Sequence, residues 1–164
     1  PGPLLPGIAN SGNLLATSHR LFNLEAAATY EALVVQGEYQ VVMVDNARTP
    51  GNAAANPPTR PGPSLGDLAF PGAYVQALYF LTGETQTFSP DTGTFNRVVP
   101  LRNYQWGAGP GAWQVGARYA FADLSTAGVR GGRLNSATLG LNWYLNPNVR
   151  LSWNYDYTYR DEVA

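Results

Sequence analysis

Arginine is the residue type in this sequence whose chemistry stands out most clearly. All ten basic residues are arginines, and the 164 residues include no lysine. A guanidinium group stays charged at physiological pH, and its planar fork binds oxyanions through two parallel hydrogen bonds. The composition therefore points to anion binding, although a GC-rich coding sequence is an alternative source of the same bias.

Residues for covalent catalysis or metal binding are scarce. The sequence has no cysteine and one histidine, His19, whereas a hydrolase needs a nucleophile, a base and a group that orients the base. The aspartates of the predicted loops lack the spacing of a calcium loop, and the glycine clusters do not join a strand to a helix as a nucleotide site requires. We therefore predict a protein that is not an enzyme and has no cofactor or metal. The net charge of −1 argues against nucleic acid as a partner.

Strict alternation of apolar and polar residues organises the chain between residues 111 and 159. Three runs, residues 113–121, 137–145 and 149–158, place large and often aromatic side chains on one face and small or polar ones on the other. A period of two residues predicts β-strands. These strands are longer than the ~5–6 residues usual in soluble proteins.

Three further strands are predicted earlier in the chain, at residues 19–30, 32–44 and 72–82. An alanine-rich helix from Leu24 to Ala32 is the alternative to part of the first. In the third, Leu78 and Phe80 interrupt the polar face, so we expect another segment to pack against them.

Two environments explain this alternation. In a soluble sandwich the apolar faces form the core, and such a protein would bind carbohydrate through exposed aromatic residues. In an outer-membrane barrel the apolar face meets lipid and the polar face lines a lumen. Aromatic residues near the strand ends, a tight turn at residues 146–148 and a longer glycine- and arginine-bearing loop at the opposite end favour the barrel. No apolar run approaches the ~18 residues of a transmembrane helix.

Two long loops are predicted, at about residues 46–70 and 83–110. The first is rich in proline, glycine, alanine and asparagine, which is typical of a surface loop. The second joins strands at the end where a barrel has short turns, and it contains Arg97 and Arg102. We expect it to fold back into the lumen and narrow it.

Six strands are too few to close a membrane barrel, which needs at least ~8 strands, or ~16 for a conducting channel. We therefore predict an all-β, transmembrane antiparallel barrel of about 16 strands when complete. The chain would supply roughly six of them, as part of one barrel domain that spans residues 1–164.

Four sequence segments between Ala73 and Tyr155 resemble the C-terminal half of the phosphate-selective porins. They are YFLTGE (residues 79–84), GTFNRV (residues 93–98), GAW (residues 111–113) and LGLNWYLNPN (residues 139–148). The resemblance implies a homotrimeric channel in the bacterial outer membrane that is embedded in lipid and passes phosphate or other small anions. It also implies that an N-terminal half and a closing strand lie outside this chain. The family also uses lumenal lysines, which this chain lacks, so one alternative is a general porin without phosphate preference. The other is a structural envelope barrel with a plugged lumen, because Leu78 and Phe80 face inward.

Five arginines are candidates for lining the pore and binding anions. Alternation places Arg118 and Arg150 on the polar face, and Arg97 and Arg102 would join them if their loop folds inward. Arg20 begins the first strand and is expected near one mouth of the channel.

Four of these five assignments have a structural alternative. Arg118 and Arg150 would instead form cross-strand ion pairs with Glu25, Glu38 or Asp156, and Arg97 and Arg102 would be solvated loop charges. Two other arginines, at positions 130 and 133, are expected in the glycine-rich outer loop, where they would attract anions towards the pore.

Overall fold

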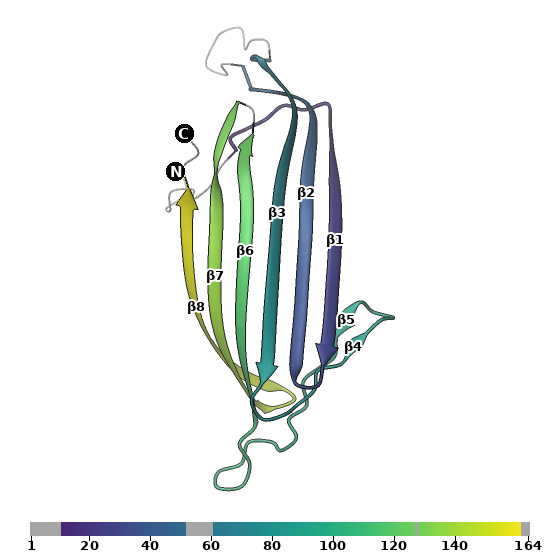
Figure 1. Ribbon diagram of the computed structural model, residues 1–164, viewed down its shortest axis with the longest axis vertical. Coiled ribbons are helices and arrows are strands. Elements are labelled where there is room, and N and C mark those ends of the chain that lie inside the picture. Colours follow the sequence, from purple (N-terminus) through teal and green to yellow (C-terminus); the bar gives the residue numbers. More distant parts are fainter. Residues whose placement is uncertain (1–10, 52–60, 127, 162–164) are drawn as a thin grey trace.

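The described part of the chain is a single twisted antiparallel sheet with one folded connection at its end. The computed structural model describes residues 11–51, 61–126 and 128–161. Its six-stranded sheet has the order β1-β2-β3-β6-β7-β8 (Figure 1). The sheet is therefore a meander, in which each long strand pairs with the next long strand along the chain. The strands are β1 (Ser18–Tyr30), β2 (Leu33–Arg48), β3 (Ser64–Phe80), β6 (Ala112–Thr126), β7 (Val129–Asn146) and β8 (Val149–Asp161).

This arrangement confirms the all-β prediction with six long strands. The alternative helix from Leu24 to Ala32 is wrong, because β1 runs through Tyr30 and β2 begins at Leu33. Within the described ranges, no helix has the length and apolar character needed to cross a membrane.

The strands extend further than the alternation predicts at the end opposite the 81–111 connection. Since β2 continues to Arg48 and β3 begins at Ser64, the predicted loop at 46–70 is too long; its residues 52–60 lie outside the described part. Proline obscures this extension in the sequence. Pro71 directly precedes the first residue of β3 that pairs with β6, and a proline fits a strand that is unpaired on one side.

The glycine-rich loop predicted between the first and second of the three C-terminal alternating runs is also wrong, because β6 ends at Thr126 and β7 already begins at Val129. Arg130 and Arg133 therefore belong to β7. A Cβ atom at Gly131 would collide with the backbone oxygen of Leu124. Glycine is needed here because the strands approach closely, and this requirement interrupts the alternation that would have revealed the strand.

The pairing register gives the sheet two continuous faces. One row of directly opposed residues crosses all six strands and defines the polar face: Ala27, Gln36, Gln76, Arg118, Thr138 and Asp156. The neighbouring row defines the apolar face: Ala28, Val35, Ala77, Ala117, Leu139 and Tyr155. Leu139 and Tyr155 are 62% and 67% exposed. No second sheet in the described part covers them, so the arrangement is not that of a soluble sandwich.

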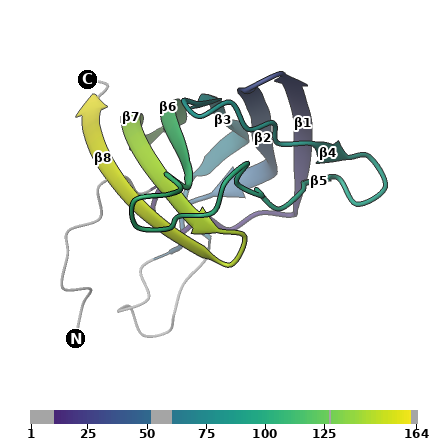
Figure 2. The ribbon, with the colours of Figure 1, turned by 90° about the horizontal axis from the view of Figure 1, so that it is seen from below.

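The connection between β3 and β6 begins by packing on the polar face. It contains the short strands β4 (Phe88–Ser89) and β5 (Thr94–Phe95) and crosses below the sheet towards β1 (Figure 2). Val98 is 6% exposed in a cluster that includes Val34 and Phe80, with Leu78 packed against it. The prediction that another segment covers Leu78 and Phe80 is confirmed.

A buried carboxylate fixes the path of this connection. Glu84 is 2% exposed; it accepts hydrogen bonds from the Thr82 hydroxyl and, at 3.1 Å, from the backbone N–H of Leu101. Thr82 in turn accepts a bond from the N–H of Trp113, at the start of β6. These bonds link the start of the connection to Leu101 in its second half and to the start of β6.

Candidate functional site

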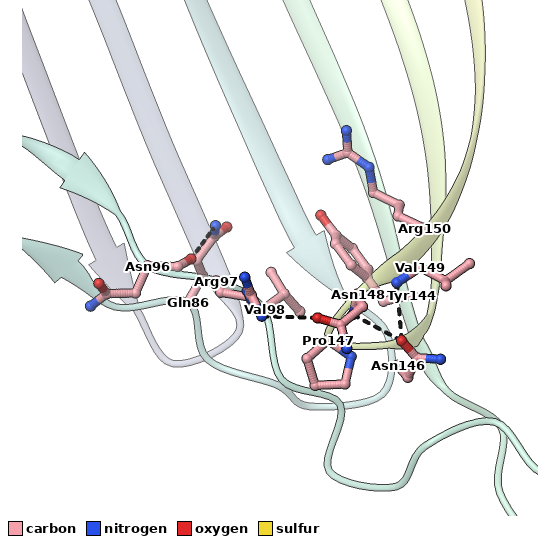
Figure 3. A pocket seen from close by; sticks show the side chains of 10 residues that line it. All are labelled: Gln86, Asn96, Arg97, Val98, Tyr144, Asn146, Pro147, Asn148, Val149 and Arg150. Atoms are coloured by element: carbon pink, nitrogen blue, oxygen red, sulfur yellow. Dashed lines mark hydrogen bonds between the residues drawn. The ribbon is translucent and has the colours of Figure 1, made fainter.

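The main candidate site lies where the connection meets the turn between β7 and β8. A cavity of about 250 Å³ opens there, and Figure 3 shows the side chains around it. They come from the connection (Gln86, Asn96, Arg97 and Val98) and from the end of β7, the turn and the start of β8 (Tyr144, Asn146, Pro147, Asn148, Val149 and Arg150).

Asparagines hold this turn and position one of the arginines. The side-chain oxygen of Asn146 accepts the backbone N–H groups of Asn148 at 2.8 Å and Val149 at 3.0 Å, which closes the turn. Asn148 then accepts a hydrogen bond of 3.0 Å from Nη1 of Arg97 (Figure 3). Because Arg97 uses one N–H here, most of its donors stay available to a ligand.

Arg150 lies on the polar face at the beginning of β8 and lines the same cavity as Arg97. Its guanidinium carbon is 5.7 Å from the centre of the Tyr144 ring, within the range of a cation–π contact. Both arginines are exposed. The cavity thus combines two positive charges with amide and hydroxyl groups, which is a composition suited to a small anion.

Arg118 occupies a second position on the polar face, halfway along β6. Its guanidinium stacks on the Tyr74 ring at 3.8 Å from the centroid. The Tyr74 hydroxyl accepts a bond of 3.0 Å from Gln36, which fixes the ring. Arg118, Tyr74 and Glu38 line another cavity, of about 260 Å³.

The ion pairs of the described residues lie elsewhere. They are Arg20 with Asp45, at 2.7 Å, and Arg133 with Asp123, at 2.8 Å. In this part of the chain, Arg97, Arg118 and Arg150 therefore have no carboxylate at ion-pair distance. The same residues include no group of three or more potential ligands that could hold a metal ion.

Comparison with known proteins decides the family. The model of the family described as phosphate-selective porin O and P matches residues 7–163. The chain belongs to this family. It is therefore a protein of the bacterial outer membrane, and its open six-stranded sheet is consistent with a fragment of a porin-like barrel.

Two relatives illustrate how much of such a porin this chain represents. It is 36% identical over 86 residues to an uncharacterized protein of Caulobacter vibrioides, covering 52% of this chain and 17% of that protein. It is 31% identical over 107 residues to Porin O of Pseudomonas aeruginosa, covering 60% of this chain and 23% of Porin O. The matches thus span about a fifth of each relative.

The faces of the sheet decide where the remaining predicted site residues of the porin lie. In a membrane barrel the apolar face meets lipid. Arg20 shares the parity of Phe22 and Leu24, so it lies on the apolar face, bonded to Asp45. Alternation in the sequence already contained this signal.

Arg102 lies apart from the cavity of Arg97 and Arg150. Two residues further on, Tyr104 contacts Trp143, which is on the apolar face. The connection therefore divides, since the part around Arg97 packs on the polar face and the part around Tyr104 turns to the other side.

Sequence reasoning missed the polar residues that support the arginines of this porin, chiefly Tyr74, Tyr144 and Asn148. In the sequence, the asparagines around Pro147 indicate only a turn. Their second role depends on Arg97, which is 51 residues from Asn148 in the chain. No local pattern could predict that contact.

Proposed function

We propose that this chain forms part of the wall of a water-filled outer-membrane channel through which phosphate or other small anions diffuse. Residues 1–164 are, in this proposal, the C-terminal part of a single barrel domain. Arg97, Arg118 and Arg150 line the lumen. The observation that carries the proposal is that all three lie on the polar side of the sheet without a carboxylate partner among the described residues.

Unpaired arginines in a narrow polar channel favour anions for two reasons. Low-dielectric walls focus the field of the charges and raise the local concentration of counter-ions. The guanidinium fork also binds a phosphate with two parallel hydrogen bonds. Because Arg97 and Arg150 surround one cavity, an anion there meets two positive charges at once.

The folded connection supports a narrowed channel. Val98 and its neighbours cover the polar face at one end, and this brings Arg97 within reach of the β7–β8 turn. A constriction lined by charged side chains selects ions more strongly than a wide pore does. Phosphate preference and assembly into a homotrimer belong to the same proposal, and the membership of the family supports them.

A structural envelope barrel with a plugged lumen is the second candidate. The apolar docking of the connection favours it, because packed side chains exclude water. A general porin without phosphate preference would keep the channel of the main proposal and lack only its preference for phosphate.

The test uses the full-length protein in planar bilayers under a salt gradient. We expect the double variant Arg97→Ala, Arg150→Ala to lose most of its anion selectivity and its block by added phosphate, whereas Arg97→Lys, Arg150→Lys should keep the selectivity and weaken the block. Arg20→Ala is the control, because it removes an arginine charge from the apolar face.

Three results would argue against the proposal. Unchanged selectivity in the double alanine variant would show that these arginines do not control permeation. Selectivity without phosphate block in the parent would leave a general anion porin. Absence of current from correctly folded parent protein would favour the structural barrel.

A further inference from the structure

The second half of the connection presents large apolar side chains that the proposed channel does not use. Leu101 is 71% exposed and Trp106 is 90% exposed. Trp106 lies in a closed turn: the N–H groups of Ala108 and Gly109 donate to the oxygen of Gln105 at 2.9 and 3.0 Å. The turn is thus ordered by its own backbone, and it holds Trp106 outward instead of burying it.

This turn is attached to the apolar face of the sheet. The backbone N–H of Tyr104 donates to the backbone oxygen of Leu145 at 2.7 Å. The Tyr104 ring packs edge-to-face against the Trp143 ring, with 4.9 Å between the ring centroids. The indole N–H of Trp143 donates to the backbone oxygen of Pro110 at 2.8 Å. The Trp143 ring also stacks on the Trp113 ring, with 4.8 Å between the ring centroids. Both sides of the turn are therefore fixed to the tryptophans that end the apolar face.

We propose that Trp106 is a membrane anchor that inserts into the interfacial region of the leaflet at this end of the barrel, with phospholipid as the occupant. The anchor is continuous with the face that meets lipid, since Tyr104 lies against Trp143. Tryptophan suits such an interface because its ring is apolar and its N–H can reach head groups. One connection then serves two surfaces, the lumen at Val98 and the bilayer at Trp106.

The test measures the depth of Trp106 in the full-length protein, reconstituted in phosphatidylcholine vesicles. A spin label at Trp106→Cys, in a background without other cysteines, reports its collisions with oxygen, which is enriched in lipid, and with a water-soluble nickel complex. Leu139→Cys on the apolar face and Thr92→Cys between β4 and β5 are the reference positions. We expect the oxygen-to-nickel ratio at position 106 to lie well above that at position 92 and below that at position 139.

Two outcomes would overturn the anchor. A ratio equal to that at position 92 would place Trp106 in water. Protection from both reagents would mean that another protein surface, such as a second subunit, covers it.

A second readout keeps the native indole. The fluorescence that is lost in Trp106→Phe should be quenched when the vesicles contain lipids brominated near the head group. Unquenched emission would contradict insertion.

Discussion

The guanidinium of Arg118 shows how a single side chain is prepared for a role in permeation. The Tyr74 ring supports one face of the group, and Gln36 fixes that ring through its hydroxyl. Stacking restrains the side chain and leaves its charge intact. An ion pair would also restrain the side chain, but it would neutralise the charge. This arrangement differs from the expected alternative, in which Glu25, Glu38 or Asp156 pairs with the arginine.

Glu38 is the residue that should oppose anion passage at this position, because it lines the same cavity as Arg118. We predict that Glu38→Gln makes the full-length channel a few-fold more selective for anions, since it removes a negative charge from the polar face and leaves the volume unchanged. Reversal potentials under a salt gradient measure the effect. The control is Asp161→Asn, which makes the same change on the apolar face. An equal shift in both variants would contradict the assignment of the faces.

For single residues, the sequence predicts well which face of the sheet a side chain occupies. It predicts poorly which residues, distant in the chain, that side chain contacts. Alternation alone assigns Arg118 and Arg150 to the polar face, as the register has them. Extended to the start of β1, the same alternation places Arg20 with Phe22 on the apolar face, as the register has it. The shared cavity of Arg97 and Arg150 depends on how the connection folds, and no spacing rule contains that information.

The connection between β3 and β6 is the element whose packing matters most for the channel. We predict that Val98→Ala loosens it, because truncating this buried valine costs about 1–2 kcal/mol of packing. Single-channel recordings should show a larger and noisier conductance. Val99→Ala is the matched control, because Val99 is the next residue along the chain and its side chain is exposed. Identical conductance in the two variants would mean that the connection does not narrow the lumen.

Glu84 provides an independent way to release the same element. Glu84→Ala removes the part-buried hydrogen bond that the Leu101 N–H donates to the carboxylate, which should cost about 1.5–3 kcal/mol because the acceptor is charged. We expect a lower urea midpoint for unfolding in detergent micelles, together with a conductance change like that of Val98→Ala. Glu84→Gln keeps an acceptor oxygen and should recover most of the loss. Equal loss in both variants would show that the negative charge, and not the bond to Leu101, matters.

Element by element, alternation predicts where strands exist better than where they end. It finds all six long strands, and Leu78 and Phe80 even disclose the segment that packs on them. It fails at Pro71 and Gly131, where a backbone requirement replaces the expected side chain. The division of the connection between the two faces is invisible as well, because loops carry no periodic signal.

For the whole molecule, the two faces of the sheet make opposite demands on a substitution. Thr138 and Leu139 are neighbours in β7, on the polar and apolar faces respectively. We predict that Leu139→Arg destabilises the folded barrel by about 2–4 kcal/mol, because the charge faces lipid. Thr138→Arg should be tolerated in the lumen. Folding into phospholipid vesicles, followed by protease protection, compares the two; equal yields would contradict the orientation of the sheet.

Properties of the whole barrel depend on strands beyond the six of this sheet. Within the described residues, β1 and β8 each pair with one neighbour only, so both edges are open to further strands of a barrel. Strand count predicts this incompleteness from the sequence, since six strands cannot close a membrane barrel. The radius of the lumen is a property of the closed barrel and is not encoded in these six strands.

The reversal potential of the unmodified full-length protein, in a planar bilayer under a potassium chloride gradient, tests the central claim most directly. The arginines on the polar face, which have no carboxylate at ion-pair distance in the described ranges, predict a potential close to the equilibrium value for chloride. Added phosphate should then reduce the current. A potential near zero or close to the equilibrium value for potassium would contradict the account.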